Sequence, residues 1–261
     1  MTELWKPTRT PRLWKRGDPA GLPMNGLIAL WDPYRDTYGL TEEARLALQT
    51  GVDYSGRGNT LTYGATTNAS TDDPVNTGTA WSFDGGDYLL GPTTAMWSNT
   101  AGMSVVAVWG VPSNATAAAM CNQYASATNK RQWFFCGNDA WNLSVQQNPA
   151  SADSNMTASL SSSPTAGQTH FLAGRWLPSV RTQIISGNFA AQAVATTPAA
   201  SMTDCSVALE IGRYNQGVSF APAGSACHLL AIYNRYLVDS EISRAYVYLK
   251  SLMARRGVTL A

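Results

Sequence analysis

The sequence has few residues of the kinds on which most catalytic sites depend. Among 261 residues there are two histidines and four cysteines, and Asp, Glu, Lys and Arg together make up only 13%. There is no Gly-x-Ser-x-Gly elbow for a nucleophilic serine, and no glycine-rich phosphate loop followed by Lys-Ser/Thr. Both histidines, His170 and His228, stand in apolar strand-like segments, which favours core residues over catalytic bases. We therefore predict a protein that is not an enzyme.

Metal-binding, membrane and nucleic-acid signals are also missing. The cysteines, Cys121, Cys136, Cys205 and Cys227, form no Cys-x-x-Cys pair, so we expect buried reduced thiols rather than zinc ligands, with a disulfide as the less favoured alternative. No apolar run approaches the roughly 18 residues of a membrane span, and no signal-peptide core is present. A net charge of +1 provides no general attraction for nucleic acid. We expect a soluble protein, made in a cytoplasm, with no cofactor.

Glycine and aromatic residues are abundant instead, with 22 Gly and nine Trp, a balance typical of turns and packed sheets. The clearest example is the segment 78–92, GTAWSFDGGDYLLGP. Trp81 and Phe83 fall on one face of an extended stretch, Gly85–Gly86 suit a tight turn, and residues 88–90 begin a second strand. This pattern predicts a β-hairpin.

Alternation and turn residues predict further strands along the chain. We expect them at 26–31, 61–63, 103–109, 117–124, 131–136, 141–147, 169–176, 180–186, 206–213 and 226–235. Both faces of 103–109 are largely apolar, as in the middle strand of a sandwich. Helices are expected at 41–49 and from about 239 to 256, and polar loops at 65–78, 148–167 and 187–202. In the second helix we expect Asp239 or Ser240 as the cap and Glu241 as a favourable charge at the start, and one apolar face is formed by Ile242, Ala245, Tyr246 and Leu249. This organisation predicts one domain, residues 26–261, preceded by an extended arm, residues 1–25.

Three segments carry a family resemblance. FDGGDYL at 83–89, DYSGRGNTLTYG at 53–64 and AIYNRYLVDSEI at 231–242 occur in this order. With them the chain resembles the laminin-G-like and concanavalin A-like jelly-roll family of lectins and glucanases. The resemblance implies an all-β antiparallel jelly-roll sandwich, here with an amino-terminal arm and a carboxyl-terminal helix. Glucanases of the family carry Glu-x-Asp-x-x-Glu on a strand, and none of the five glutamates has this spacing. A hydrolase with an unfamiliar site remains a hypothesis, ranked third after the structural and glycan-binding functions described below.

The arm combines cations with apolar side chains that a disordered tail would normally lack. We assign partner anchoring to Trp5, Lys6, Arg9, Arg12, Leu13, Trp14, Lys15 and Arg16. Two interpretations stay equal at this point. The arm either folds back on its own sandwich or docks into a neighbouring subunit.

The arm and sandwich layout is similar to that of bacteriophage head-decoration and tail-associated proteins. This resemblance implies a non-enzymatic structural protein of the virion, anchored to other virion proteins or to copies of itself through the arm, with the sandwich displayed outward. Location in the head and location in the tail are equally compatible with it. The alternative function is a glycan-binding adhesin or lectin module.

Glycan binding would require exposed aromatic rings together with polar groups that bond sugar hydroxyls. The candidate aromatic residues are Trp97, Tyr124, Trp133, Trp141 and Tyr214, with Asn122 and Gln123 among the nearby amides. Aromatic residues are enriched in strands anyway, so a structural role is favoured for them. Calcium would require loop carboxylates, for which Asp53, Asp72, Asp73, Asp84 and Asp87 are available. Bonds within glycine-rich turns explain the two aspartates of the 83–89 segment without a metal, so calcium is not favoured.

Overall fold

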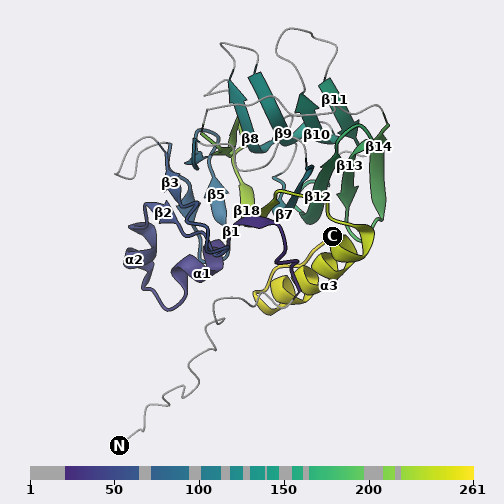
Figure 1. The fold of residues 1–261 in the computed structure, drawn as a ribbon. Helices are drawn as coiled ribbons and strands as arrows, with labels where there is room; N and C mark the ends of the chain where they lie inside the picture. The colour runs from purple at the N-terminus through teal and green to yellow at the C-terminus, as the bar shows by residue number, and fades with distance from the viewer. Residues whose placement is uncertain are drawn as a thin grey trace, which may run out of the picture.

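The computed structural model describes residues 21–64, 72–93, 101–112, 118–125, 130–138, 140–146, 155–160, 165–196, 208–214 and 219–261. These residues form two eight-stranded antiparallel sheets, a two-stranded sheet and three helices (Figure 1). The two large sheets pack face to face, and the last helix lies against the outer face of one of them. The predicted all-β jelly-roll sandwich with a carboxyl-terminal helix is confirmed.

Sheet A contains the strands nearest the carboxyl-terminal helix. Their order is β14-β13-β12-β7-β18-β5-β4, and β1 also pairs with β18. The bounds are β1 (Leu27–Trp31), β4 (Val75–Asn76), β5 (Trp81–Phe83), β7 (Met103–Gly110), β12 (Thr169–Leu177), β13 (Arg181–Ser186), β14 (Ala191–Ala195) and β18 (Ser225–Tyr233).

Sheet B forms the other layer, in the order β11-β10-β9-β8-β15-β6-β3-β2. Its bounds are β2 (Thr50–Gly51), β3 (Leu61–Tyr63), β6 (Leu89–Leu90), β8 (Ala118–Ala125), β9 (Lys130–Asn138), β10 (Ala140–Gln146), β11 (Asn155–Ser159) and β15 (Glu210–Ile211). The small third sheet pairs β16 (Arg213–Tyr214) with β17 (Ser219–Phe220).

Strand β7 shows why the sandwich has two cores. Every residue of β7 is buried, and alternate residues from Met103 to Trp109 belong to the core between the sheets. Val106 and Val108 point the other way, into a second core that includes the carboxyl-terminal helix. The apolar pattern on both faces of this segment therefore predicted its central position correctly.

The second core is closed by helix α3 (Asp239–Arg255). Ile242, Ala245, Leu249 and Met253 recur every three or four residues and are all buried against sheet A. The capping position is Val238, one residue before Asp239 and two before Ser240, the expected caps. The backbone N–H of Val238 donates to the Glu241 carboxylate over 3.0 Å, as in a capping box.

An excursion, residues 33–52, separates β1 from the Asp53 turn. It contains α1 (Pro33–Thr37) and α2 (Glu42–Leu46), and Figure 1 shows both at the end of the sandwich near β2 and β3. The helix predicted at 41–49 is confirmed, although it is shorter. Its first turn is capped by the Thr41 hydroxyl, which accepts from the Ala44 N–H over 3.2 Å. Helix α1 was not predicted, because its five residues are too few to show a period.

The predicted hairpin at 78–92 is wrong in its pairing. Trp81 and Phe83 are buried as expected, but β5 pairs with β4 and β18 in sheet A, whereas β6 pairs with β3 and β15 in sheet B. The glycine turn therefore carries the chain from one sheet to the other. Side-chain bonds close this corner, since Asp87 accepts from the Asp84 N–H over 2.7 Å and Asp84 accepts from the Gly86 N–H over 2.9 Å.

Four other expectations need correction. The segments expected as loops at 65–78, 148–167 and 187–202 contain the strands β4, β11 and β14. The single strand expected at 206–213 is divided between β15 and β16, which belong to different sheets. Gly212 stands at the break with a φ of +80°, and a Cβ there would lie 2.3 Å from the Phe83 ring. A position that requires glycine so strictly interrupts the strand.

Candidate functional site

The predicted anchoring residues lie in the part of the chain that precedes Gly21. Trp5, Lys6, Arg9, Arg12, Leu13, Trp14, Lys15 and Arg16 are all outside the described residues. The last residues of the expected arm are described, and Leu22 and Pro23 are buried, with Leu22 in the core under α3. The packed structure therefore begins no later than Leu22.

The predicted glycan-binding aromatics are only partly described. Trp97 lies outside the described residues, and the backbones of Tyr124, Trp133, Trp141 and Tyr214 belong to β8, β9, β10 and β16, with their side chains outside the description. The register brings three of these positions onto neighbouring strands. Trp133 pairs with Gln123 of β8 and Val145 of β10, and Trp141 pairs with Gly137 of β9.

The amides beside these aromatics have structural roles. Asn122 and Gln123 are 1% and 0% exposed, and the Asn122 side-chain NH₂ donates to the Arg213 carbonyl. The Arg213 guanidinium in turn bonds Glu210 and lies 3.6 Å from the centre of the Tyr88 ring. Side chains that are buried in this way lie within the sandwich rather than face a ligand.

The candidate calcium ligands are used by turns. Asp53 accepts from the Leu30 and Ser55 N–H groups over 3.0 and 2.8 Å, and from the Asn59 N–H over 2.9 Å. Burial raises the pKa of Asp87 to about 7, and its carboxylate accepts from the Asp84 N–H over 2.7 Å within the turn. Across the described residues, no three His, Cys, Asp or Glu side chains are grouped so that they would hold a metal ion.

Both histidines are core residues, as predicted. His170 is 8% exposed and His228 is 7% exposed, and burial lowers the pKa of each. A ring nitrogen of His228 lies 3.0 Å from the Thr79 carbonyl, where a neutral imidazole donates. The thiols of Cys121 and Cys227 are buried, also as expected, while Cys205 and the side chain of Cys136 lie outside the described residues.

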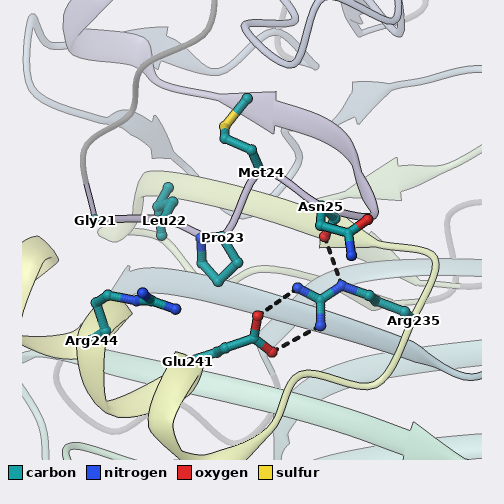
Figure 2. Close-up of a pocket in the computed structure, with 8 residues that line it drawn as sticks. All are labelled: Gly21, Leu22, Pro23, Met24, Asn25, Arg235, Glu241 and Arg244. Carbon is teal, nitrogen blue, oxygen red and sulfur yellow. Dashed lines mark hydrogen bonds and ion pairs between the residues drawn. The ribbon is translucent and has the colours of Figure 1, made fainter.

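An open pocket lies where the chain enters the sandwich beside the start of α3 (Figure 2). Its volume is about 270 Å³. We call it the Arg244 pocket, and its lining consists of Gly21, Leu22, Pro23, Met24, Asn25, Arg235, Glu241 and Arg244. One wall is thus the extended segment before β1, and the other wall comes from the β18–α3 connection and the first turns of the helix.

A fixed ion pair forms one side of the Arg244 pocket. The Arg235 guanidinium donates to both carboxylate oxygens of Glu241, over 2.8 and 2.6 Å, and its Nε donates to the Asn25 carbonyl over 2.7 Å (Figure 2). This pairing raises the pKa of Arg235 and lowers the pKa of Glu241. Glu241 therefore stays ionised at neutral pH and is a poor proton donor.

Arg244 lies on the opposite side of the carboxylate, one helical turn after Glu241. Its side chain is exposed, and within the described residues it makes no hydrogen bond or ion pair. Two guanidinium groups and one carboxylate leave the Arg244 pocket with one positive charge in excess. The pocket is consequently suited to an anionic group and unsuited to acid–base catalysis by Glu241.

Sequence reasoning missed Arg235 and Arg244 as members of a site. Glu241 was recognised only as a favourable residue at the start of a helix. Arg235 belongs to the AIYNRYL motif, but no spacing rule connects that segment with residues 21–25 more than 200 positions earlier.

Among the helices of the described part, none is both long and apolar enough to span a lipid bilayer.

Sequence comparisons identify no relative of the chain. No family model matches it, and no curated protein matches it. Solved structures do match. The receptor-binding domain of botulinum neurotoxin D superposes with a TM-score of 0.61 at 11% identity, covering 88% of this chain and 54% of that chain.

Two similar structures are complexes with a sugar. The botulinum neurotoxin serotype D ligand-binding domain in complex with N-acetylneuraminic acid gives a TM-score of 0.60 at 10% identity, covering 86% of this chain and 51% of that one. The Trypanosoma rangeli sialidase in complex with sialic acid gives a TM-score of 0.57 at 13% identity, and the match covers 87% of this chain and 33% of the sialidase. The chain spans about half the length of the neurotoxin domains and a third of the sialidase. At these identities the likeness establishes the sandwich fold alone.

Proposed function

We propose that the chain is a non-enzymatic glycan-binding module whose Arg244 pocket holds the carboxylate of an acidic sugar. The observation that carries this proposal is the Arg244 guanidinium, which lines an open polar pocket, acts on Glu241 only through its charge, and makes no hydrogen bond or ion pair among the described residues. The fold supports it, because structurally similar sandwiches occur in proteins whose complexes contain sialic acid.

The size and chemistry of the pocket agree with one sugar residue. Its volume of about 270 Å³ lies just below the roughly 300–1,000 Å³ of drug-sized ligand sites. A guanidinium binds a carboxylate through two parallel hydrogen bonds, and the exposed Asn25 side chain offers an amide for hydroxyl groups. Because Arg235 and Glu241 are already bonded to each other, their positions are fixed before a ligand arrives.

A titration with free N-acetylneuraminic acid tests the proposal, followed by the methyl ester of the same sugar. We expect one weak site for the acid, and at least a tenfold loss of affinity for the ester and for Arg244→Ala, since a charge-assisted hydrogen bond contributes about 1.5–3 kcal/mol. Chemical shift changes in the NMR spectrum measure both affinities.

The matched control is Arg255→Ala. Arg255 is an exposed arginine near the other end of the same helix, bonded to Ser251 over 3.1 Å. Its removal changes the net charge equally and should leave sugar binding unchanged. Equal affinity in the Arg244→Ala protein, or no response to acidic sugars at millimolar concentration, would overturn the proposal.

We propose, as a second candidate, a structural role in a virus particle, attached to the head or the tail. The supporting observation is a concentration of exposed apolar side chains at the excursion, a surface of the kind that assembling proteins present. Deleting residues 1–20 tests this role. The truncated protein should fold but fail to enter particles, and normal incorporation would exclude anchoring by the arm.

A further inference from the structure

One end of the sandwich exposes an unusual share of apolar side chains. Ten large apolar residues of the described part are exposed, and five of them lie in or beside the excursion. We call these five the excursion surface: Tyr38 (52% exposed), Leu40 (44%), Leu46 (49%), Val52 (46%) and Val75 (49%). The helix α2 contacts β4, so Val75 belongs to the same end of the molecule as Leu46.

Helix α2, which carries Leu46 of the excursion surface, is weakly held in place. Helix α2 has five residues and none of them is buried. Its described attachments are the Thr41 cap and Arg45, which donates to the Asn76 carbonyl and pairs with Glu42 at 3.9 Å. An isolated helix of this length is unstable in water, so the segment needs further contacts to keep its shape. Within the part of the chain that the structure describes, both sheets also end here, at the edge strands β2 and β4.

The charge of the excursion surface is acidic. Glu42 and Glu43 are exposed beside Leu40 and Leu46, and the nearby cation Arg45 is already engaged. The first 20 residues of the chain offer the complement. They contain five cations and the apolar residues Trp5, Leu13 and Trp14. Before residue 18 they contain only one acidic residue, Glu3, so this segment is positively charged.

The point at which the chain enters the fold is close enough for this segment to reach. Gly21 packs on α3, where an added Cβ would lie 2.2 Å from the Tyr248 ring. Near the end of the same helix, Arg256 donates to Asp32 over 2.8 and 2.7 Å and lies 4.3 Å from the Tyr34 ring centre at the start of α1. The five residue steps from Arg16 to Gly21 span about 17 Å when extended, which exceeds the roughly 12 Å of helix between Tyr248 and Arg256.

We propose that the excursion surface is the docking site of the chain's own residues 5–16. The tryptophans and Leu13 cover the exposed apolar side chains, and the cations face Glu42 and Glu43. Docking within one chain is favoured over docking between copies, because a short tether gives an effective concentration in the millimolar range. This inference is independent of the sugar site, since a cut after residue 20 keeps residues 21–25, which form the wall of the Arg244 pocket.

Hydrogen exchange of the full chain, compared with a chain that begins at Gly21, tests the proposal. We expect the backbone amides of residues 42–52 to exchange at least tenfold faster in the truncated chain than in the full chain. Because docking is within one chain, this ratio of exchange rates should not depend on the protein concentration. Leu46→Ser in the full chain should reproduce this acceleration. Val247→Ser, at a residue on α3 that is 62% exposed, is the matched control and should have no effect.

A peptide of residues 1–20 provides the second measurement. Added to the truncated chain, it should restore slow exchange of residues 42–52, and Glu42→Lys with Glu43→Lys should abolish the restoration. Equal exchange in the full and truncated chains would overturn the proposal. Protection that appears only as the protein oligomerises would also overturn it, in favour of arms exchanged between copies.

Discussion

Helices α2 and α3 both begin with a capping interaction, yet they are stabilised in opposite ways. Helix α3 has 17 residues, four of which are buried on one face against sheet A. Helix α2 has five residues and buries none. The difference teaches that capping chemistry marks where a helix starts, whereas tertiary packing decides how firmly it is held.

The two regions are joined by a buried ion pair. Asp32 precedes α1 and Arg256 follows α3, and their side chains are only 5% and 6% exposed. The same guanidinium lies over the Tyr34 ring. The excursion is thus tied at its base to the end of α3, whereas α2 in its middle part buries no side chain and is attached to β4 through Arg45.

Breaking this connection should have the largest effect on stability. Arg256→Met leaves Asp32 buried without its partner, and we expect a loss of about 3–5 kcal/mol in the free energy of unfolding. Urea denaturation measures the loss. Arg255→Met, at an exposed position of the same helix, should change stability by less than about 0.5 kcal/mol. A loss below about 1 kcal/mol for Arg256→Met would mean that the connection is not important for stability.

Leucine truncation compares the two helices directly. Leu249→Ala removes a fully buried side chain from α3 and should cost about 2–5 kcal/mol. Leu46→Ala removes a side chain that is 49% exposed, so about 0.5 kcal/mol or less is expected in the chain that begins at Gly21. Similar losses at the two positions, measured by the same urea titration, would contradict the contrast between the helices.

A smaller effect should appear in the pH dependence of stability. Burial raises the pKa of Asp36 in α1 from 3.8 to about 7, against the lowering effect of a 2.8 Å hydrogen bond from the Tyr54 hydroxyl. The folded protein then binds a proton between these values that the unfolded chain releases. The contribution of Asp36 to the free energy of unfolding is therefore most favourable below pH 4, and it declines as the pH rises to 7.

Asp36→Asn should remove this part of the decline and stabilise the protein at pH 7.5 by roughly 1–3 kcal/mol. Thermal unfolding at intervals between pH 4 and 8 provides the profile. Asp87, whose pKa is also raised to about 7, should account for a remaining slope of the same sign. Glu43→Gln, at an exposed carboxylate, is the control. An unchanged slope in Asp36→Asn would show that this carboxylate ionises freely in the folded state.

The sequence was informative wherever one residue type repeated over a whole element. The apolar faces of 103–109 predicted a central strand, and the spacing of Ile242, Ala245 and Leu249 predicted the face of α3. Strands β11 and β14 escaped prediction because small and polar residues, such as NMTAS and AQAVA, show no strong alternation of large apolar side chains. The error at 78–92 has another cause, because local turn chemistry does not specify which sheet receives the next strand.

The candidate site was much less predictable than the fold. The Arg244 pocket joins residues 21–25 to residues 235–244, and no local pattern connects these segments. As amides, Asn122 and Gln123 were candidates for hydrogen bonds to sugar hydroxyls, but both side chains are buried within sheet B and do not reach the surface. Exposure and long-range proximity decide whether a polar residue binds a ligand, and neither can be read from spacing.

The pairing of the first strand with the last has a consequence for biosynthesis. Among the described strands β1 pairs with β18, from Leu27 opposite Tyr233 to Trp31 opposite Leu230, and β18 also separates β7 from β5. During translation, sheet A therefore lacks its middle until residues 225–233 have left the ribosome. The strands made earlier must wait with apolar faces uncovered, so slow folding and a need for chaperones during synthesis are expected of this topology.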